Sequence, residues 1–455
     1  MPEQSSAWVI VVGAGIAGLT AAHFLAKADI RVKVLEASGR VGGRMITDAV
    51  SGFTVDCGAQ FLSSEYPLLR SIVREIGLQE SPRPTSPWNA IVRQGKICRI
   101  RAGNPLHVLA SGLLGPASWM KLGWQLWRQR SALASLPLND YSQWSGFDTE
   151  SISSWANRTL DSPALEYIFE PMLQGFYFQE PEETSLALGL ILFAFGSRRA
   201  RTLALSGGMG AIPEAIAARL DVALHASVRS MTCDGDSVVV ATDAARIEAE
   251  HVILAIPAHE AKRLYRSDDE ITNRLMAVPY SSTINIAVVA GSGFHLPEPL
   301  KDVYGLLVPR QERRQIAAIC IEKNKYRGGG QEGQLLNILL CHASAMAMMA
   351  LPDDEIVAAA TEEAEKFLPG LTAQIRAARL YRWEYAEPYS QVGRAREIAE
   401  YRSSGRALDR RVWLAGDFMS MPFNEGAAES GKWAADAICK QLAKNSREAR
   451  MTVPS

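Results

Sequence analysis

The chain contains few cysteines. Their placement argues against a protein stabilised by disulfides and against one stabilised by a cysteine-ligated metal. The 455 residues include six cysteines, without a Cys-x-x-Cys pair and without a histidine and cysteine cluster at metal-ligand spacing. Single, scattered thiols are typical of buried cysteines in a reducing compartment. We therefore expect no metal site, no disulfide framework and a cytoplasmic location.

The chain also lacks an excess of charge and a long apolar run. Lysine plus arginine number 48 and aspartate plus glutamate 49, so the sequence has no global field that would attract nucleic acid. The most apolar stretches, residues 186–195 and 335–351, are too short or too interrupted by polar residues to span a bilayer. The short polar N-terminus carries no recognisable secretory signal. We expect a small-molecule substrate and no nucleic-acid partner.

The N-terminal residues, in contrast, carry a clear structural pattern. A β-branched run at 8–12 stops at Gly13, apolar positions at helical spacing follow to Leu25, and a second strand-like run occupies 31–36. Two strands joined by a helix are parallel neighbours in one sheet. This unit predicts the start of a doubly wound, Rossmann-type α/β domain.

The rest of the chain predicts a second domain that interrupts the first one, since the length exceeds what one core usually serves. Tryptophan-rich, strand-poor sequence between Trp88 and Phe195 predicts a helical insertion in an α+β substrate domain. Strands are expected at 238–242, 251–256, 283–290, 335–340 and 411–415, and helices at 353–368 and 427–442. The predicted domains are a dinucleotide domain of 1–85, 200–265 and 405–445, a substrate domain of 86–199 and 266–404, and a frayed tail of 446–455.

The turn after the first strand has the pattern of a dinucleotide site. Gly13 makes the tight turn, Gly15 lets a pyrophosphate approach the backbone beside Ala14, and Gly18 lets the helix and strand pack closely. The helix N-terminus supplies free amides for the phosphates. Glu36 ends the second strand, where a carboxylate accepts hydrogen bonds from a ribose and disfavours NADP. These residues leave NAD and FAD open.

The residues after Glu36 distinguish the two cofactors. Residues 36–44 read Glu-Ala-Ser-Gly-Arg-Val-Gly-Gly-Arg, and this continuation resembles the flavin-dependent amine oxidase and protoporphyrinogen oxidase superfamily. Similar matches follow at 56–61, 207–215, 252–257 and 414–431. The resemblance implies FAD as the cofactor. It adds as cofactor-binding residues Ala37, Arg44, Gly58, Ala59, Gln60, Val228, Gly416, Asp417, Glu425, Gly426 and Ala427. For Asp417, a role as a turn residue stays an equal alternative.

The resemblance does not by itself identify the oxidised bond. Asn285 stands where many amine oxidases carry a lysine near the flavin, whereas 169–186 resembles a protoporphyrinogen oxidase pattern. Trp383 matches an aromatic residue that faces the flavin ring, with core packing as an alternative. For Asn285 the alternative is a polar residue on a half-exposed strand face. No general base is assigned, and Trp383, Asn285 and Gln60 are the candidates near the flavin.

Three functions remain open from the sequence. The leading hypothesis is an FAD-dependent oxidoreductase that removes a hydride from a C–N or C–C bond of a partly apolar substrate, similar to protoporphyrinogen oxidase. The alternatives are a flavin amine oxidase and a protein that binds flavin without redox chemistry. The resemblance implies non-covalent FAD, because 385–401 contains no cysteine where covalent members attach the flavin.

The stretch from Trp119 to Arg130 allows two structures. It carries three tryptophans and three basic residues, a composition typical of an interfacial helix with aromatic side chains at headgroup depth. Packing of the tryptophans in a core is the interpretation that we favour, because the polar face is short. Peripheral membrane contact stays open as the alternative.

Overall fold

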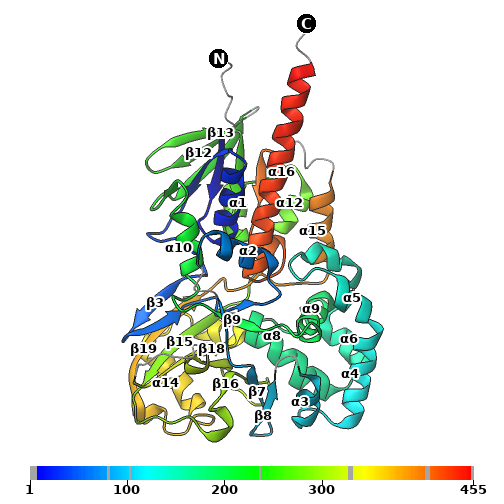
Figure 1. Ribbon diagram of the computed structural model, residues 1–455, viewed down its shortest axis with the longest axis vertical. Coiled ribbons are helices and arrows are strands. Elements are labelled where there is room, and N and C mark those ends of the chain that lie inside the picture. Colours follow the sequence, from blue (N-terminus) through cyan, green and yellow to red (C-terminus); the bar gives the residue numbers. More distant parts are fainter. Residues whose placement is uncertain are drawn as a thin grey trace.

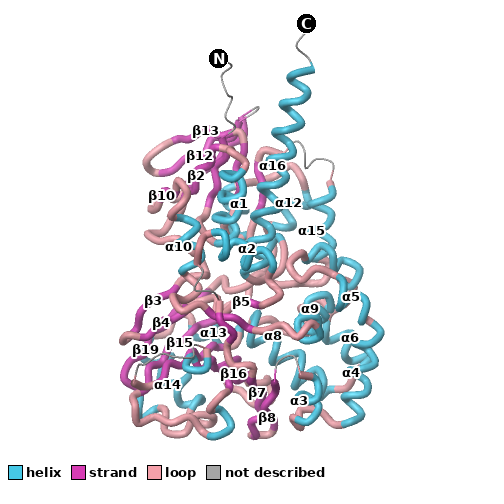
Figure 2. Tube along the Cα trace, in the orientation of Figure 1, coloured by secondary structure: helices cyan, strands magenta, loops and turns pink. Residues whose placement is uncertain are grey.

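The computed structural model describes residues 8–78, 82–101, 104–234, 237–325, 332–404 and 410–451. Figure 1 shows two parts: an upper one with both described ends of the chain, and a lower one with a sheet on one side and helices on the other. Figure 2 separates the lower part clearly into strands and helices. Within the described residues, no helix is both long enough and apolar enough to cross a membrane.

The upper part is built on a five-stranded sheet in which every pairing is parallel. Its order is β10-β2-β1-β14-β20, with bounds Val222–Ala223, Arg31–Leu35, Trp8–Val12, His251–Leu254 and Val412–Leu414. All five strands come from the three segments predicted for the dinucleotide domain. The α/β class and the Rossmann-type sheet are confirmed, whereas the exact domain boundaries stay a prediction.

Alternate residues of β1 are buried against different layers. Val9 and Val11 share a core with helices α1 (Ile16–Lys27), α2 (Pro67–Glu75), α10 (Ala211–Ala217) and α16 (Asn424–Met451). Ile10 and Val12 face the opposite core, which is covered by β11 (Val228–Asp234), β12 (Ser237–Thr242), β13 (Arg246–Ala249) and α11 (Ala258–Leu264). This period of two follows from the strand pleat, and it fixes α1 against the sheet.

The lower part contains a seven-stranded sheet, ordered β19-β15-β18-β17-β16-β7-β8. Its strands span Ile375–Trp383, Thr283–Ala290, Gln334–Leu340, Ile316–Ile321, Val303–Leu307, Trp88–Arg93 and Lys96–Arg101, and only β16 and β7 pair in parallel. Ile284 and Ile286 of β15 share a core with α14 (Asp353–Ala364). Because side chains alternate along a strand, Asn285 points away from α14 and toward the upper part.

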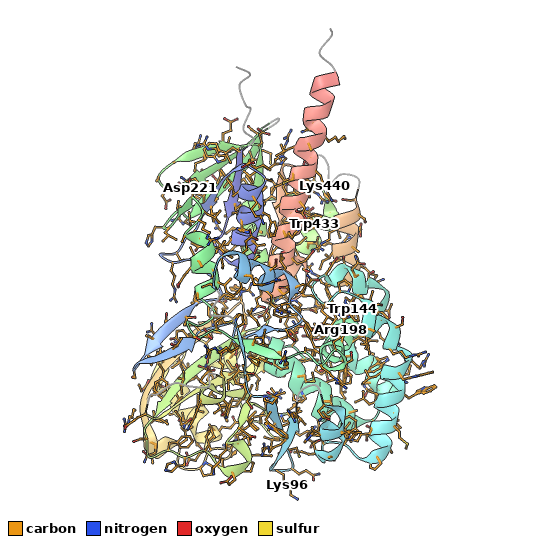
Figure 3. The ribbon with its side chains drawn as sticks, in the orientation of Figure 1. Lys96, Trp144, Arg198, Asp221, Trp433 and Lys440 are labelled. Carbon is orange, nitrogen blue, oxygen red and sulfur yellow. The ribbon has the colours of Figure 1, made fainter. Side chains whose placement is uncertain are left out.

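Helices occupy the other side of the lower part, but they begin later than the sequence predicts. Residues 88–101 form the hairpin β7–β8 instead of helix, because Gln94 and Gly95 both adopt positive φ and close a tight turn. The helical elements follow as α3 (Pro105–Ala110), α4 (Pro116–Arg128), α5 (Arg130–Ser135), η1 (Tyr141–Phe147), α6 (Ile152–Thr159), α7 (Ser162–Ala164), η2 (Leu165–Phe169), α8 (Glu170–Tyr177) and α9 (Leu186–Ser197). Arg198, labelled in Figure 3, ties this cluster together by donating from Nε to the Leu133 carbonyl over 3.0 Å.

Two tryptophans of α4 contradict the core-packing interpretation of this stretch. Trp124 and Trp127 are 57% and 52% exposed, and their rings stack with centroids 5.0 Å apart. Trp119, in contrast, is partly buried against the core. The helix therefore presents two of its three tryptophans to solvent. Sequence periodicity alone did not predict which of the three would be exposed.

Short elements complete the chain and connect the two parts. The remaining strands are β3 (Thr47–Val50), β4 (Phe53–Asp56), β5 (Leu62–Ser63), β6 (Arg83–Pro84) and β9 (Thr202–Ala204). The remaining helical elements are α12 (Glu270–Leu275), η3 (Glu298–Leu300), η4 (Glu322–Asn324), α13 (His342–Met348), η5 (Thr372–Gln374), α15 (Arg394–Ser403) and η7 (Asp417–Met419).

Helix α16 is longer than predicted. It continues to Met451 and extends past the upper part in Figure 1, so the tail predicted as frayed is helical for most of its length. Residues 440–451 are rich in lysine, arginine, alanine and glutamate, which are strong helix formers. Residues 452–455 lie outside the described part.

Candidate functional site

A large cavity lies between the two parts of the molecule. Its volume is about 1660 Å³, and residues from the parallel sheet, the seven-stranded sheet and the helical cluster all line it. Sites for a single small ligand usually occupy about 300–1,000 Å³. The cavity therefore has room for a dinucleotide together with a second molecule.

The three glycines of the predicted dinucleotide turn have different surroundings at one end of this cavity. A Cβ on Gly13 would lie 2.5 Å from the Ala255 carbonyl oxygen, and one on Gly18 would lie 2.0 Å from the Gly13 oxygen. A Cβ on Gly15 would meet nothing within 4 Å. Gly13 and Gly18 are thus required by packing, whereas Gly15 faces open space directly before α1. The first amides of α1 have no partner within the helix and suit a phosphate group there.

Glu36 holds this turn from the end of β2. Its carboxylate accepts hydrogen bonds from the amides of Ala14 and Ser38, at 2.8 and 2.9 Å. Glu36 and Ala37 line the cavity, and so does Val228 at the start of β11. Their roles toward an adenosine stay predictions, but all three lie at the end of the cavity where the sequence places that group.

Arg44 forms a buried charge pair farther along the cavity wall. Its guanidinium donates to both oxygens of Asp417, at 2.6 and 2.9 Å. Burial raises the pKa of the neighbouring Glu387 well above its ordinary value; Arg44 opposes this shift, while Asp417 adds to it. Asp417 is the closer partner of Arg44, since the Glu387 Oε2 atom lies 3.9 Å from the Arg44 guanidinium. No local sequence pattern marks Glu387 as a residue of the site.

Gly58 and Trp383 lie against each other at the middle of the cavity. The Trp383 indole donates to the Cys57 carbonyl over 2.9 Å, and a Cβ on Gly58 would approach its ring to 3.2 Å and the Arg44 carbonyl oxygen to 2.4 Å. Only glycine fits between them. Trp383 lines the cavity and is partly exposed within it, so its ring is a wall of the site.

Asn285 is buried, which excludes the alternative of a half-exposed strand face. Every residue of β15 is buried, and Asn285 is 1% exposed while it still lines the cavity. Its amide donates to the carbonyls of Asp56 and Cys57. Within the described residues, its Oδ1 has no hydrogen-bond partner. A buried acceptor of this kind fits a donor on a bound molecule.

A buried polar network behind Gln60 was missed by the sequence analysis. The Lys325 ammonium, fully buried, lies 2.7 Å from Asp56 Oδ2, 3.2 Å from Glu322 Oε2 and 3.4 Å from Gln60 Oε1. Gln60 in turn donates to the carbonyls of Asp56 and Gly58. The network therefore fixes the segment 56–60, which borders the cavity. Its two local pairs, Asp56 with Gln60 and Glu322 with Lys325, lie about 265 positions apart, so no single motif could bring them together.

The start of α16 forms another part of the wall, but Glu425 has a different role from the predicted one. Asn424 and Ala427 line the cavity, whereas the Glu425 carboxylate accepts from the amides of Leu68 and Leu69 at 2.7 and 2.8 Å. Glu425 thus caps the N-terminus of α2, which has no side-chain cap of its own. It supports the wall without lining it.

The buried cap predicts a pH effect on stability. Burial raises the pKa of Glu425 to about 7, although the two α2 amides oppose the shift. The carboxyl group loses its proton at a lower pH in the unfolded protein than in the folded one. The contribution of Glu425 to the free energy of unfolding therefore falls as the pH rises from about 4.5 to 7, by up to ~3 kcal/mol. We expect the stability of Glu425→Gln relative to the wild type to rise by up to ~3 kcal/mol between pH 5 and pH 8, because glutamine does not titrate. Urea unfolding at both values measures this.

The control is Glu362→Gln, on an exposed position of α14. Its difference from the wild type should not change with pH. A Glu425→Gln difference that is constant from pH 5 to 8 would contradict the raised pKa.

Most predicted site residues meet around the cavity. Those that line it are Gly13, Gly15, Glu36, Ala37, Arg44, Gly58, Ala59, Gln60, Val228, Asn285, Trp383, Gly416, Asp417 and Ala427. Ala14, Gly18, Glu425 and Gly426 lie behind the wall. A Cβ on Gly426 would come 2.3 Å from the Met421 carbonyl oxygen, so Gly426 is required for close packing.

Aromatic side chains form another part of the cavity wall. Tyr66 and Phe423 stack with ring centroids 5.3 Å apart, and Phe195 and Phe176 line the same space. Phe61 contacts Phe176 edge to face at 6.0 Å. These residues come from separate segments, and no local sequence pattern indicates that they would meet. They make this part of the cavity suitable for a flat or apolar molecule.

Comparison with known proteins identifies the family. The family described as flavin containing amine oxidoreductase matches residues 16–439, nearly the whole chain. The chain belongs to this family. A relative described as a putative flavin-containing monoamine oxidase, from Mycobacterium tuberculosis, is 30% identical over 260 residues, which cover 55% of this chain and 56% of that protein. Protoporphyrinogen oxidase 2 from Arabidopsis thaliana is 28% identical over 181 residues, 39% of this chain and 34% of the relative. The chain thus spans about half, or less, of the length of these curated relatives.

Solved structures of family members share the fold over almost the full length. A putative protoporphyrinogen oxidase from Exiguobacterium sp. 255-15 superposes with a TM-score of 0.77 at 20% identity, covering 96% of this chain and 99% of that one. Putrescine oxidase with bound putrescine gives 0.75 at 21% identity, covering 95% and 99%. The fold is therefore shared with a protein described as a putative protoporphyrinogen oxidase and with a putrescine oxidase, so it does not discriminate between these activities.

Proposed function

We propose that the chain binds FAD non-covalently in this cavity and removes a hydride from a partly apolar small organic substrate. The observation that carries the proposal is one continuous cavity whose wall includes Gly15, with open space at its Cβ position, and also Glu36, Trp383 and Asn285. The same cavity is lined by several aromatic side chains, and its volume leaves room for a substrate beside a dinucleotide.

The lining residues fit FAD held without a covalent bond. Cys57 and Cys320 line the cavity, and burial raises the pKa of each to about 12. Both are therefore protonated thiols at neutral pH, and thiols are far weaker nucleophiles than thiolates. Together with the absence of cysteine from 385–401, this supports reversible binding.

In the reaction, the protein positions the cofactor and the substrate and excludes water from the site. The chemistry that FAD supplies when bound is the acceptance of a hydride. Arg44 and Asp417 form a charge pair that holds β20 against the turn after β2, and Gln60 is locked by Lys325 beside Gly58. The aromatic walls keep water from the substrate carbon. Glu387 also lines the cavity, and burial raises its pKa well above the ordinary value of a carboxyl group.

The leading version is oxidation of a C–C or C–N bond in the manner of protoporphyrinogen oxidase. The aromatic side chains and the asparagine at position 285 support it. Amine oxidation is the second candidate, supported by relatives described as monoamine and putrescine oxidases. A protein that binds FAD without redox chemistry is the third. A cytoplasmic site of action is part of this proposal, on the ground of the scattered thiols.

Anaerobic titration of the FAD-loaded protein tests these versions against each other. Porphyrinogens, polyene precursors and a panel of amines are added while the flavin absorption band is followed. Bleaching by a porphyrinogen or polyene supports the leading version, and bleaching by amines alone supports the second. If dithionite reduces the flavin but no added substrate bleaches it, both enzyme versions are overturned and the third version is supported.

A further inference from the structure

Apolar side chains gather on the outer side of α3 and α4. Among the described residues, Leu106, Leu109, Met120, Trp124 and Trp127 are five of the eleven exposed large hydrophobic residues. Met120, Trp124 and Trp127 are spaced by four and three residues, so they share one face of α4. We call these five residues the α3–α4 face. An exposed apolar cluster of this kind marks a docking site more often than a free surface.

The α3–α4 face lies in a segment that carries charge of one sign. Residues 81–138 contain no aspartate or glutamate, in a chain whose formal net charge is −1. They contain eight basic residues: Arg83, Arg93, Lys96, Arg99, Arg101, Lys121, Arg128 and Arg130. Acidic neighbours from other segments pair with two of them, Asp161 with Lys121 and Asp302 with Arg99. Figure 3 places Lys96 at the lower edge of the molecule, at the end that carries α3.

The cavity reaches the surface at this face. Trp119, Leu122 and Leu126 on the inner side of α4 line the cavity, while Trp124 and Trp127 lie on its outer side. Leu109 both lines the cavity and is 47% exposed. Arg130 also lines it, and its guanidinium lies 4.2 Å from the Trp127 ring centroid. A single layer of helix separates the cavity from the exposed tryptophans.

We propose that the α3–α4 face docks on the surface of an anionic lipid bilayer. Tryptophan rings sit at headgroup depth, leucine and methionine enter the acyl boundary, and the lysines and arginines attract lipid phosphates. A second copy of the chain fits the face poorly, because two copies would bring two positively charged segments together. Docking does not depend on the redox reaction. Entry of an apolar substrate from the bilayer beside Leu109 does rest on the proposed function.

Vesicle cosedimentation tests the docking. We expect the FAD-loaded protein to bind vesicles of phosphatidylglycerol and phosphatidylcholine in low salt, and to bind at least about tenfold more weakly to phosphatidylcholine alone or in 0.5 M salt. The double variant Trp124→Ser, Trp127→Ser should lose at least about tenfold in vesicle affinity. Circular dichroism and flavin absorption verify that the variant is folded.

Leu351→Ser is the matched control, because Leu351 is 38% exposed beside α14, outside the basic segment. Its vesicle affinity should equal that of the wild type. The proposal is overturned if the wild type binds no vesicle, or if Leu351→Ser weakens binding as much as the double variant. It is also overturned if light scattering shows that the wild type is a dimer and the double variant is a monomer. None of these outcomes bears on flavin reduction, so docking and the proposed reaction fail separately.

Discussion

Replacement of Gly15 with valine is expected to weaken FAD binding by at least about 100-fold, or ~3 kcal/mol, while the apoprotein stays folded. Gly15 has φ −73° and ψ 174°, which valine adopts readily, and the space around its Cβ position is open to 4 Å. The new side chain would therefore enter the place of the pyrophosphate without disturbing the protein. FAD titration followed by protein fluorescence measures the dissociation constant.

Gly18→Val is the matched comparison within the same turn. Its Cβ would lie 2.0 Å from the Gly13 oxygen and 3.1 Å from the Ala255 Cβ. We expect this variant to lose about 3 kcal/mol or more of the free energy of unfolding as apoprotein, because α1 must move away from the sheet. Equal FAD affinity of Gly15→Val and the wild type would place the cofactor elsewhere.

Replacement of Lys325 with methionine is expected to lower the free energy of unfolding by about 3–5 kcal/mol. The substitution keeps an unbranched side chain, one atom shorter, but removes the cation that lies between Asp56 and Glu322. Asp56 is 0% exposed and also accepts from the Thr47 hydroxyl and the Met209 amide. A buried carboxylate that loses its cation is strongly destabilising. Denaturant unfolding of the apoprotein measures the loss.

Lys323→Met is the control for Lys325→Met, because Lys323 is an exposed lysine two residues away. Its effect should stay within about 0.5 kcal/mol. Addition of Asp56→Asn to Lys325→Met should recover part of the stability, since it removes the unbalanced charge. A loss below 1 kcal/mol for Lys325→Met would contradict a structural role of the network.

The sequence predicted what depends on local pattern. The strand, glycine turn and helix at 8–25 were correct because periodicity, turn geometry and helix spacing all act within a few residues. The strands predicted at 251–256 and 283–290 followed for the same reason, since apolar runs of that length form buried strands. The position of Glu36 followed from the end of the second strand-like run. The family resemblance then brought distant segments such as 56–61 and 414–431 to one site, and residues of both segments line the cavity.

What the sequence did not predict depends on contacts between distant segments. Lys325 reaches Asp56 across 269 positions, and Glu425 reaches Leu69 across 356. Burial of Asn285 follows from the neighbours β18 and β19 on both sides of its strand. Trp119 and Trp124 belong to one amphipathic pattern, and only the packing of α4 on its neighbours decides which is exposed. The hairpin at 88–101 was missed because its first strand, β7, pairs with β16, far along the chain.

The most direct test of the account is to identify the flavin on the purified protein after acid precipitation. The account predicts a flavin absorption band in the native protein, retained or restored by added FAD. It also predicts that precipitation releases all of the flavin into the supernatant as intact FAD, in a stoichiometric amount. The account is contradicted if no flavin band develops with FAD, if the released flavin is not FAD, or if the flavin stays attached to the precipitated chain.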